Sequence, residues 1–456
     1  MSPGFTIVGA GPVGTLLALL LARRGRRVRL LERRADPRDT PPERGRSINL
    51  ALAARGIAAL EQAQIMPRLA PHLVPMAGRM LHDGHGGLTF LRYGQRAHEV
   101  IHSISRERLN RVLIQAAAEH AAIDLQFSQR CLDVDVASAT LQLRDERDGA
   151  LRAERFEALL GADGAGSQVR AALVRRALSR AHEDELAHDY KELVIPARAA
   201  SVGQTTTAYA FEPQALHIWP QGDHMLIALP NTDGSFTATL FLPRDGEPSF
   251  HSLRDAHAVR GFFQQRFADA AAAIPDLEAQ FAQHPQGRLG TLHCDRWQVD
   301  GRVMLLGDAA HAIVPFHGQG LNCGFEDCLV LDRLLAHEQS QAAAFERFER
   351  QRQPDAAAIA AMALENYAEM RDTVRSAGFA RRQRLAAELE RRFPGRFIPR
   401  YSMVMFHPEM TYAEAQRRGA RQERVLDALE VLHQGAGPLP DSVAEQSRRL
   451  LDEQGL

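Results

Sequence analysis

The chain has 456 residues, 45% of them hydrophobic and 24% charged, so it is long enough for two or three domains with large cores. Its formal net charge of -1 gives no long-range attraction for nucleic acid or an acidic membrane surface. No run of about 18 uncharged apolar residues indicates a membrane span, and the four cysteines lack C-x-x-C spacing. We therefore expect a cytoplasmic protein with reduced thiols, no bound metal, no nucleic-acid partner and no membrane partner.

The first thirty residues have the pattern of a dinucleotide-binding unit. Phe5–Val8 is a short apolar run typical of a buried parallel strand, and an amphipathic helix is predicted from about Val13 to Arg24. Between them lies the G-x-G-x-x-G loop Gly9-Ala10-Gly11-Pro12-Val13-Gly14. A second apolar run, Val28–Leu31, ends at Glu32.

Each part of this unit has a physical task in nucleotide binding. Gly9 allows a tight turn, Gly11 lets the backbone approach a pyrophosphate, and Gly14 lets the helix pack close to the strand. The helix N-terminus offers unpaired N–H groups to the phosphates, and Glu32 can accept hydrogen bonds from a ribose diol. An ordinary glycine turn is the alternative, but strand, helix and acid together favour an adenine dinucleotide.

The next hundred residues mix helices with short strands. Ser47–Leu60 is predicted to be a helix, and the basic stretch Arg44–Ser47 either is a solvated loop or contacts phosphates. Met76–Val100 has short runs broken by Asp83-Gly84 and Gly86-Gly87, which predicts hairpins away from the nucleotide site. Ser105 is a candidate N-cap of a helix that runs to about Ala118.

The middle of the chain reads mainly as strands. Strand-like runs lie at Asp124–Phe127, Cys131–Val136 and Thr140–Arg144. A further apolar strand is predicted from Ala158 through Gly161 to the turn signal Asp163-Gly164, before a helix that starts at Ser167. Thr205–Leu242 has polar turns every 8–12 residues, which predicts an antiparallel meander, and a helix is expected near Ala256–Phe267.

The α/β pattern returns near residue 300. Val303–Leu306 is a predicted buried strand, followed by Gly307-Asp308-Ala309-Ala310-His311, by Pro315–Gly320, and by a helix from about Leu321. The remainder is predicted to be helical to about Arg392, with a break at Pro354.

One late helix carries a polar residue on an apolar face. Asn366 lies in a stripe with Ile359, Ala363 and Met370. A buried amide needs a partner, so Asn366 either bonds a neighbouring backbone group or faces a pocket.

Three motifs stand in a fixed order: Gly9–Gly14 with Glu32, Gly161–Gly164, and Gly307–His311 with Pro315. This set resembles the single-component, FAD-dependent aromatic hydroxylases. The resemblance implies non-covalent FAD, held by Gly9, Ala10, Gly11, Gly14, Glu32, Arg33, Arg34, Ala51, Arg106, Asp163, Asp308, Gly320, Leu321 and Asn322.

Further stretches narrow the resemblance to the kynurenine 3-monooxygenase branch of that family. They are Gly45–Leu52, Gly78–Met80, Leu216–Pro220, Pro315–Gly320, Met362–Tyr367 and Ile398–Met403. The resemblance implies that Arg79 and Tyr93 hold the substrate carboxylate, and that Asn366 and Tyr401 complete the polar contacts. It further implies that the aromatic ring is surrounded by Phe236, Phe316, His317 and Met370.

The implied reaction is the hydroxylation of L-kynurenine to 3-hydroxy-L-kynurenine. NADPH would reduce FAD, and O2 would form a flavin C4a-hydroperoxide, with His317 and Phe316 tuning the flavin and ring environment and no obligatory side-chain base. Only one dinucleotide loop is present, so NADPH is expected to visit transiently. Eukaryotic members carry a hydrophobic C-terminal membrane segment, whereas Phe406–Leu456 is charged and interrupted here.

Three alternatives remain open at this point. They are a flavin hydroxylase of another aromatic acid or phenol, a flavin-dependent halogenase, and a non-catalytic FAD-binding protein. Trp219 stands without the W-x-W-x-I-P pattern, which argues against the halogenase.

The expected fold class is α/β, with a discontinuous Rossmann-like FAD-binding domain. We expect that domain in residues 1–75, 101–180 and 296–355, and a mostly antiparallel substrate-binding sheet in residues 76–100 and 181–295. Residues 356–456 are expected to form a C-terminal helical region that closes the substrate pocket.

Overall fold

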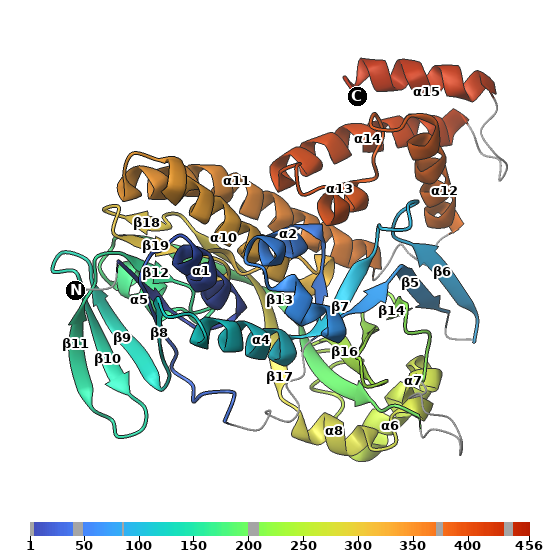
Figure 1. The fold of residues 1–456 in the computed structure, drawn as a ribbon. Coiled ribbons are helices and arrows are strands. Elements are labelled where there is room, and N and C mark those ends of the chain that lie inside the picture. Colours follow the sequence, from blue (N-terminus) through green and yellow to red (C-terminus); the bar gives the residue numbers. More distant parts are fainter. Residues whose placement is uncertain (1–3, 40–48, 84–85, 199–208, 371–376, 433–440) are drawn as a thin grey trace.

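The computed structural model describes residues 4–39, 49–83, 86–198, 209–370, 377–432 and 441–456 (Figure 1). Its strands are β1 Phe5–Val8, β2 Val28–Leu31, β3 Asn49–Leu52, β4 Val74–Met76, β5 Gly78–His82, β6 Leu88–Arg92, β7 Ile101–Ser105, β8 Ile123–Gln126, β9 Gln129–Asp135, β10 Thr140–Asp145, β11 Leu151–Arg155, β12 Leu159–Gly161, β13 Ala181–Ile195, β14 Ala215–Pro220, β15 Met225–Pro230, β16 Phe236–Pro243, β17 Gln286–Cys294, β18 Gln298–Val299 and β19 Val303–Leu305. Its α-helices are α1 Pro12–Arg23, α2 Ala54–Gln62, α3 Met66–Leu69, α4 Arg106–Ala118, α5 Gln168–Arg175, α6 Ala256–Arg266, α7 Ala268–Ala273, α8 Leu277–Gln283, α9 Asp308–His311, α10 Gly320–His337, α11 Gln341–Ala368, α12 Ala377–Arg392, α13 Arg400–Phe406, α14 Tyr412–Leu432 and α15 Asp441–Glu453.

A six-stranded sheet forms the base of the nucleotide-binding part. Its order is β18-β19-β12-β1-β2-β8, and every pair except β18/β19 is parallel. Helix α1 follows β1 directly and packs against α4 and α10. The glycine loop therefore lies at the carboxyl end of a central strand, which is where open α/β sheets bind ligands.

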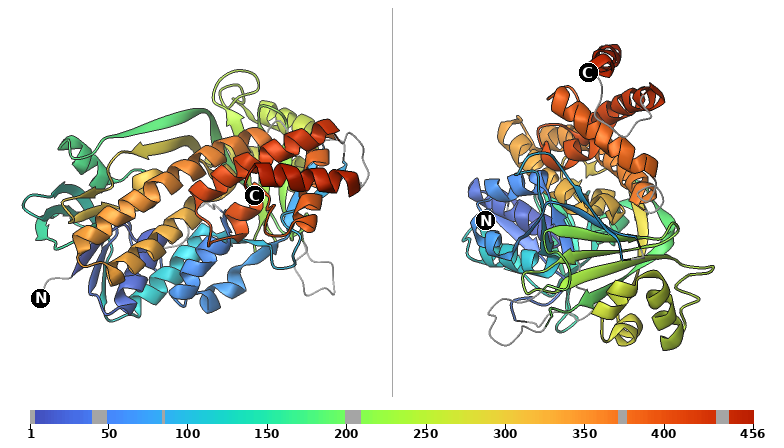
Figure 2. Two further views of the ribbon diagram at one scale, coloured as in Figure 1. Left: turned by 90° about the horizontal axis from the view of Figure 1, so that it is seen from above. Right: turned by 90° about the vertical axis from the view of Figure 1, so that its right-hand side faces the viewer.

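A seven-stranded sheet forms the second layer, in the order β17-β13-β16-β15-β14-β5-β6. All its pairs are antiparallel except β14/β5. One face packs on α6, α7 and α8 through a core that includes Trp219, Phe236 and Phe263 (Figure 2). The other face turns toward α11 and the loop before α10.

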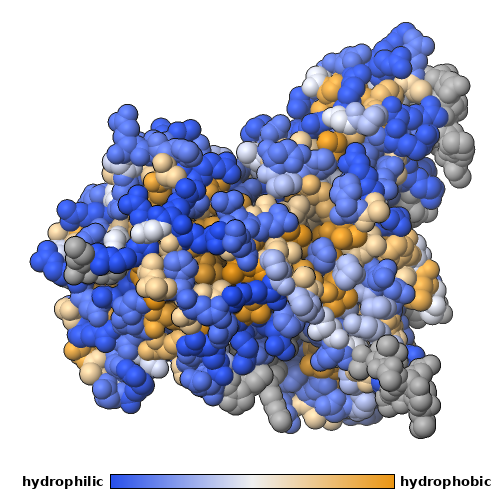
Figure 3. Space-filling view, viewed as in Figure 1, coloured by the Kyte–Doolittle hydropathy of each residue, from blue (hydrophilic) through white to orange (hydrophobic). Residues whose placement is uncertain are grey.

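The C-terminal helices cover the end of the molecule farthest from β9–β11 (Figure 1). Helix α14 packs against α11 and α13, and α15 packs on α14. The middle of the face in Figure 3 gathers apolar residues, whereas the outer parts of that face are mostly hydrophilic. Among the described residues, no helix is both long and apolar enough to cross a bilayer.

The predicted α/β fold class is confirmed, but the prediction of one helix over Ser47–Leu60 is wrong. Residues Asn49–Leu52 form β3, which pairs antiparallel with β7, and the helix begins only at Ala54. A short apolar run is ambiguous between strand and helix, and here tertiary pairing decides. The basic stretch Arg44–Ser47 and the start of the predicted meander at Thr205 lie outside the described residues.

The predicted break at Pro354 is also wrong, because α11 continues through it. A proline removes one i→i−4 hydrogen bond and costs about 3 kcal/mol in a helix interior. Two residues earlier, the buried guanidinium of Arg352 donates to Asp327 at 2.8 Å and to Glu326 at 2.6 Å. These ion pairs tie the turn to α10 and hold the helix in place.

The strands absent from the sequence-based prediction include β11, β13 and β17. Both faces of the first part of β13 are exposed, so no alternation of apolar and polar residues marks it. The two large sheets fall within the two sets of residue ranges expected for two domains. The domain boundaries themselves stay a proposal.

Candidate active site

The glycine loop is shaped by backbone contacts that only glycine permits. Gly9 has φ +105°, and a Cβ there would lie 2.4 Å from the carbonyl oxygen of Ala162. A Cβ on Gly14 would lie 2.0 Å from the carbonyl oxygen of Gly9, so the helix could not pack as it does. These two glycines fix the loop against β12.

Gly11 serves a different purpose, because space beside it is open. A Cβ built on Gly11 would meet no atom of the described residues within 4 Å. Gly11 is the N-cap of α1, no side chain caps the helix there, and its first turn holds no acidic residue. The positive end of the helix therefore faces open space, which fits the phosphate groups of a dinucleotide.

Glu32 holds the loop from the end of β2. One carboxylate oxygen accepts from the Ala10 amide at 2.9 Å, and the other accepts from the Arg34 amide at 3.0 Å. Both neighbouring arginines, Arg33 and Arg34, are exposed. The carboxylate keeps lone pairs for a ligand hydroxyl, so its predicted role is compatible with this geometry.

The predicted residues near β3 and α10 meet in space. The Asn322 amide oxygen accepts from the Ala53 backbone N–H at 2.9 Å, and its amide nitrogen donates to the carbonyls of Ala51 at 2.8 Å and Gly318 at 2.9 Å. Asp308 exposes its carboxylate, and a Cβ on Gly320 would lie 4.0 Å from one of its oxygens.

Three other predicted cofactor residues, Asp163, Arg106 and Leu321, have a local role or none that the structure defines. Asp163 accepts from the Ser167 hydroxyl at 2.5 Å and from the Gln168 amide at 2.7 Å, so it supports the start of α5. Burial raises the pKa of Asp163, against the effect of these donors. Arg106 begins α4 with an exposed side chain, and Leu321 is half-buried at the start of α10.

Arg79 lies in a stack of aromatic rings. Its guanidinium carbon is 4.5 Å from the ring centroid of Tyr401 and 5.7 Å from that of Tyr93. The rings of Tyr93 and Tyr401 stack at 5.3 Å, and His317 stacks on Tyr401 at 5.3 Å. The amide of Tyr93 donates to Ala77, which places Tyr93 on the same side of the β5–β6 hairpin as Arg79.

Three buried polar atoms in this stack have no hydrogen-bond partner among the described residues: Arg79 Nε, the Tyr93 hydroxyl and His317 Nδ1. A buried polar group without a partner costs free energy, so such groups mark a place for a ligand. Burial opposes the charge on Arg79, but Tyr401, Tyr93 and Glu369 raise its pKa above the ordinary value. Burial also raises the pKa of both tyrosines, so their hydroxyls stay protonated and can donate.

Burial lowers the pKa of His317 to about 3, so its imidazole is neutral. The adjacent Phe316 stacks on Tyr367 at 3.9 Å, and its carbonyl accepts from the Asn366 amide at 2.6 Å. The same amide lies 3.1 Å from the Met370 sulfur. The structure therefore shows Asn366 bonding a backbone group, which fixes the segment that carries Phe316 and His317, and its predicted contact with the substrate stays a prediction.

Phe236 does not lie with the other residues that were predicted to surround the aromatic ring of the substrate. It packs on the opposite face of the seven-stranded sheet, against Phe211 and His217. Phe241, five residues along β16 and therefore on the other face, packs against Phe316 with ring centroids 4.9 Å apart. Sequence reasoning missed Phe241, which strand alternation could have separated from Phe236 once one face was known.

Glu369 was also missed. Its carboxylate lies 3.6 Å from an Arg79 guanidinium nitrogen and is one-third exposed. It follows the end of α11 in a π-helical turn, a local geometry that is common at functional sites and has no simple sequence signal.

Known proteins similar to this chain point to one family. The family model described as "FAD binding domain" matches residues 5–363. A kynurenine 3-monooxygenase of Stenotrophomonas maltophilia is 48% identical over 432 residues, which cover 95% of this chain and 93% of that protein. A kynurenine 3-monooxygenase of Myxococcus xanthus is 44% identical over 424 residues, which cover 93% and 90%.

Solved structures show the same fold at low sequence identity. PqsL, a probable FAD-dependent monooxygenase from Pseudomonas aeruginosa, has a TM-score of 0.65 at 21% identity and covers 82% of this chain and 98% of its own. The p-nitrophenol 4-monooxygenase PnpA of Pseudomonas putida has a TM-score of 0.65 at 17% identity and covers 85% and 93%.

Proposed function

The chain belongs to the kynurenine 3-monooxygenases, within the wider family that shares this FAD-binding domain, and we propose that it hydroxylates L-kynurenine to 3-hydroxy-L-kynurenine with NADPH and O2. FAD is its cofactor. The observation that carries the substrate assignment is the stack around Arg79, where three buried polar atoms lack partners among the described residues.

The cofactor's proposed place is the junction of the glycine loop with β3 and α10. The N-terminus of α1 would receive the phosphates at Gly11, and Glu32 would accept from the ribose. Asn322 holds the backbone of β3 beside Gly318, where the flat ring system of the flavin would approach. When bound, FAD supplies the redox chemistry, taking electrons from NADPH and activating O2 for transfer to an aromatic ring.

Arg79 is the proposed anchor of the substrate carboxylate. A guanidinium can bind a carboxylate through two parallel hydrogen bonds, which fixes both position and angle. The Tyr93 hydroxyl lies beside it and would donate a further bond. The Glu369 carboxylate lies 3.6 Å from an Arg79 guanidinium nitrogen, which is longer than a hydrogen bond, so a substrate carboxylate can replace it.

Phe316 and His317 form the proposed link between substrate and cofactor. Both are buried, and both lie in the segment that Asn366 and Asn322 hold from opposite ends. His317 is neutral, so it can hydrogen-bond without adding charge beside the reacting ring. The apolar side chains of Phe241, Phe316 and Met370 exclude water from that ring, which protects an oxygen-transfer step from hydrolysis.

The aromatic amine of kynurenine activates its own ring, so this mechanism needs no side-chain base. NADPH is proposed to approach transiently from solvent, because the described residues form one glycine loop of the dinucleotide type.

Substrate-dependent NADPH oxidation tests this function. We expect L-kynurenine to stimulate NADPH oxidation strongly, whereas kynurenamine, which lacks the carboxylate, stimulates it weakly at the same concentration. A panel of phenols and benzoates serves as the comparison. Stronger stimulation and hydroxylation of a phenol or benzoate would move the assignment to another aromatic hydroxylase, and no stimulation by any compound would reject catalysis.

A further inference from the structure

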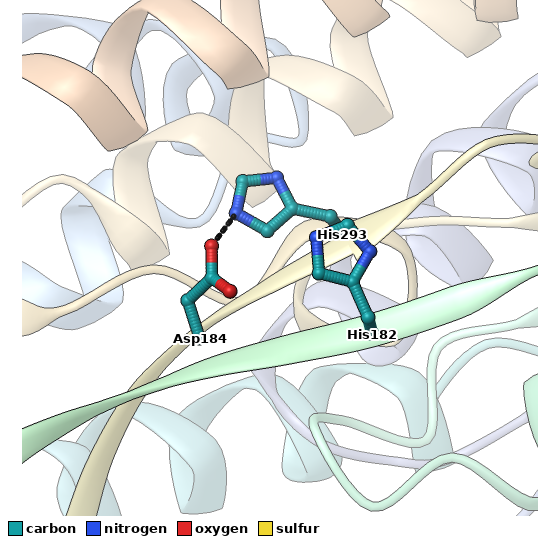
Figure 4. A group of neighbouring side chains, drawn as sticks. All are labelled: His182, Asp184 and His293. Carbon is teal, nitrogen blue, oxygen red and sulfur yellow. Dashed lines mark ion pairs between the residues drawn. The ribbon is translucent and has the colours of Figure 1, made fainter.

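Two histidines and an aspartate come together on β13 and β17, outside the motifs of the flavin site. His182 pairs directly with His293 across the two antiparallel strands, and Asp184 lies two residues from His182 on the same face. Figure 4 shows the three side chains on one side of these strands. The strand register therefore sets their spacing, not a flexible loop.

The three side chains are close enough to share one ion. A potential ligand atom from each lies within 4.8 Å of the other two. The His182 and His293 rings stack at 4.7 Å with a 15° tilt, and His293 Nε2 lies 3.1 Å from an Asp184 carboxylate oxygen. Tetrahedral zinc with bonds of about 2.1 Å needs ligand atoms roughly 3.4 Å apart, so small side-chain rotations complete the geometry.

The chemistry of the set suits a borderline transition metal. Two imidazole nitrogens and one carboxylate oxygen are common zinc ligands, and a fourth position would remain for water. His182 and Asp184 are exposed and His293 is half-buried, so an ion can enter and the side chains can turn. Arg180, two residues before His182, extends into solvent with Asp295 at 3.9 Å.

The site lies at the rim of a cavity of about 480 Å³. His182 and His293 line this cavity together with Cys294 and His311, and none of the predicted FAD or substrate residues lines it. An ion held by the three side chains would therefore have its open position beside a hollow that can hold water or a small anion.

A second group of possible ligands, His311, Cys323 and Asp327, does not share these properties. All three are buried, and the Asp327 carboxylate already accepts from His311 at 2.7 Å, from Arg352 at 2.8 Å and from the Gly307 amide at 3.1 Å. That group is a satisfied ion-pair network with no room for a cation.

We propose that His182, Asp184 and His293 form a binding site for one Zn²⁺ ion, which ties β13 to β17. Sequence reasoning assigned no metal because His293 is more than a hundred residues from His182 and Asp184, and no metal-site spacing is present. Bound zinc would stabilise the folded chain, because the paired strands that create the site exist only in the folded state.

Equilibrium dialysis of the tag-free FAD-bound protein against Zn²⁺, followed by metal analysis, tests the site. We expect one ion per chain in the wild type, and at least about tenfold weaker binding in H182A and in H293A, because each removes one of three ligands. D184N keeps the shape of the side chain but removes the anionic ligand, so it too should weaken binding. H257A, which removes an exposed histidine on α6, should bind like the wild type.

Thermal unfolding and the Co²⁺ spectrum distinguish metal binding at this site from binding at neighbouring side chains such as Cys294. Zn²⁺ should raise the melting temperature of the wild type but not that of H182A, while both should melt alike in EDTA. Co²⁺ should give a spectrum without a sulfur charge-transfer band, and C294A should bind normally. Retention of full zinc affinity in both histidine variants, absence of binding to the wild type, or a cobalt–thiolate band that C294A removes would each overturn the proposal.

Discussion

Arg79 carries most of the proposed substrate recognition at the residue scale. Removing one partner of a buried charge pair costs about 2–5 kcal/mol, or roughly 30-fold to several thousand-fold in binding. Arg79→Ala should therefore raise the KM for kynurenine steeply with unchanged FAD content, and Arg79→Lys should recover only part because the planar fork is lost. Steady-state kinetics check this, and a wild-type KM in Arg79→Ala would place the carboxylate elsewhere.

Alanine substitutions at Gly11 and at Gly14 distinguish an effect on cofactor binding from an effect on folding. Gly11 has φ −70° and open space beside it, so Gly11→Ala should fold normally but obstruct the phosphate position. We expect its FAD affinity to fall by at least about tenfold, or roughly 1.4 kcal/mol. Gly14→Ala would push on the Gly9 carbonyl and should lower the unfolding temperature as well.

FAD titration by fluorescence and thermal unfolding of the apoprotein measure the two effects. Unchanged FAD affinity in Gly11→Ala would mean that the phosphates do not approach this glycine.

The shifted pKa of His317 makes the free energy of unfolding depend on pH in a definite direction. Burial lowers its folded-state pKa from 6.5 to about 3, so between these values the unfolded chain binds more protons than the folded one. The free energy of unfolding therefore contains a contribution that is present above pH 6.5 and is lost as pH falls toward 3. His317→Gln should lose less stability than the wild type between pH 7 and 4.5, by about 2 kcal/mol.

Urea unfolding at several pH values with excess FAD measures that difference. Parallel pH curves for wild type and variant would show that His317 does not titrate as a buried neutral group.

How far single residues could be predicted depended on whether their role is local. Gly9 and Gly14 were predictable because a turn and a close helix approach are properties of a few adjacent residues. Phe236 was misplaced and Phe241 missed, because the face of a strand depends on pairing with strands far along the chain.

The elements with one buried face or a capped end could be predicted from the sequence. Helix α4 begins after Ser105, whose hydroxyl accepts from the Arg108 amide, as its N-cap position indicated. The first part of β13 could not, because it is exposed on both faces and carries no alternating pattern. The helix through Pro354 depends on ion pairs with α10, which only the tertiary structure reveals.

The C-terminal elements α13 and α14 are expected to be required for coupled hydroxylation. Tyr401 belongs to α13, and Tyr412 of α14 donates to Gln319 at 2.8 Å, in the segment that carries His317. Truncation before Phe397 should therefore abolish or uncouple hydroxylation. Product formed per NADPH oxidised measures the coupling.

A shorter truncation after residue 432 is the control, because it removes α15, which packs on α14 and not on the site. Full coupling in the longer truncation would show that these helices do not complete the pocket.

At the scale of the whole molecule, three parts of the chain meet at one junction. The parallel sheet presents the glycine loop, the antiparallel sheet presents Arg79, and the C-terminal helices present Tyr401. The α/β class and the first of these parts were predictable because they rest on motifs of adjacent residues. Their meeting at the loop that carries His317 rests on contacts between distant segments, which no local pattern encodes.

The most direct test of the central claim is mass analysis of the product formed from L-kynurenine, NADPH and oxygen-18-labelled O2. We expect 3-hydroxy-L-kynurenine that carries one labelled oxygen atom, formed only when all three reactants are present. Unmodified kynurenine, with NADPH consumed only to hydrogen peroxide, or a product without the label, would contradict it.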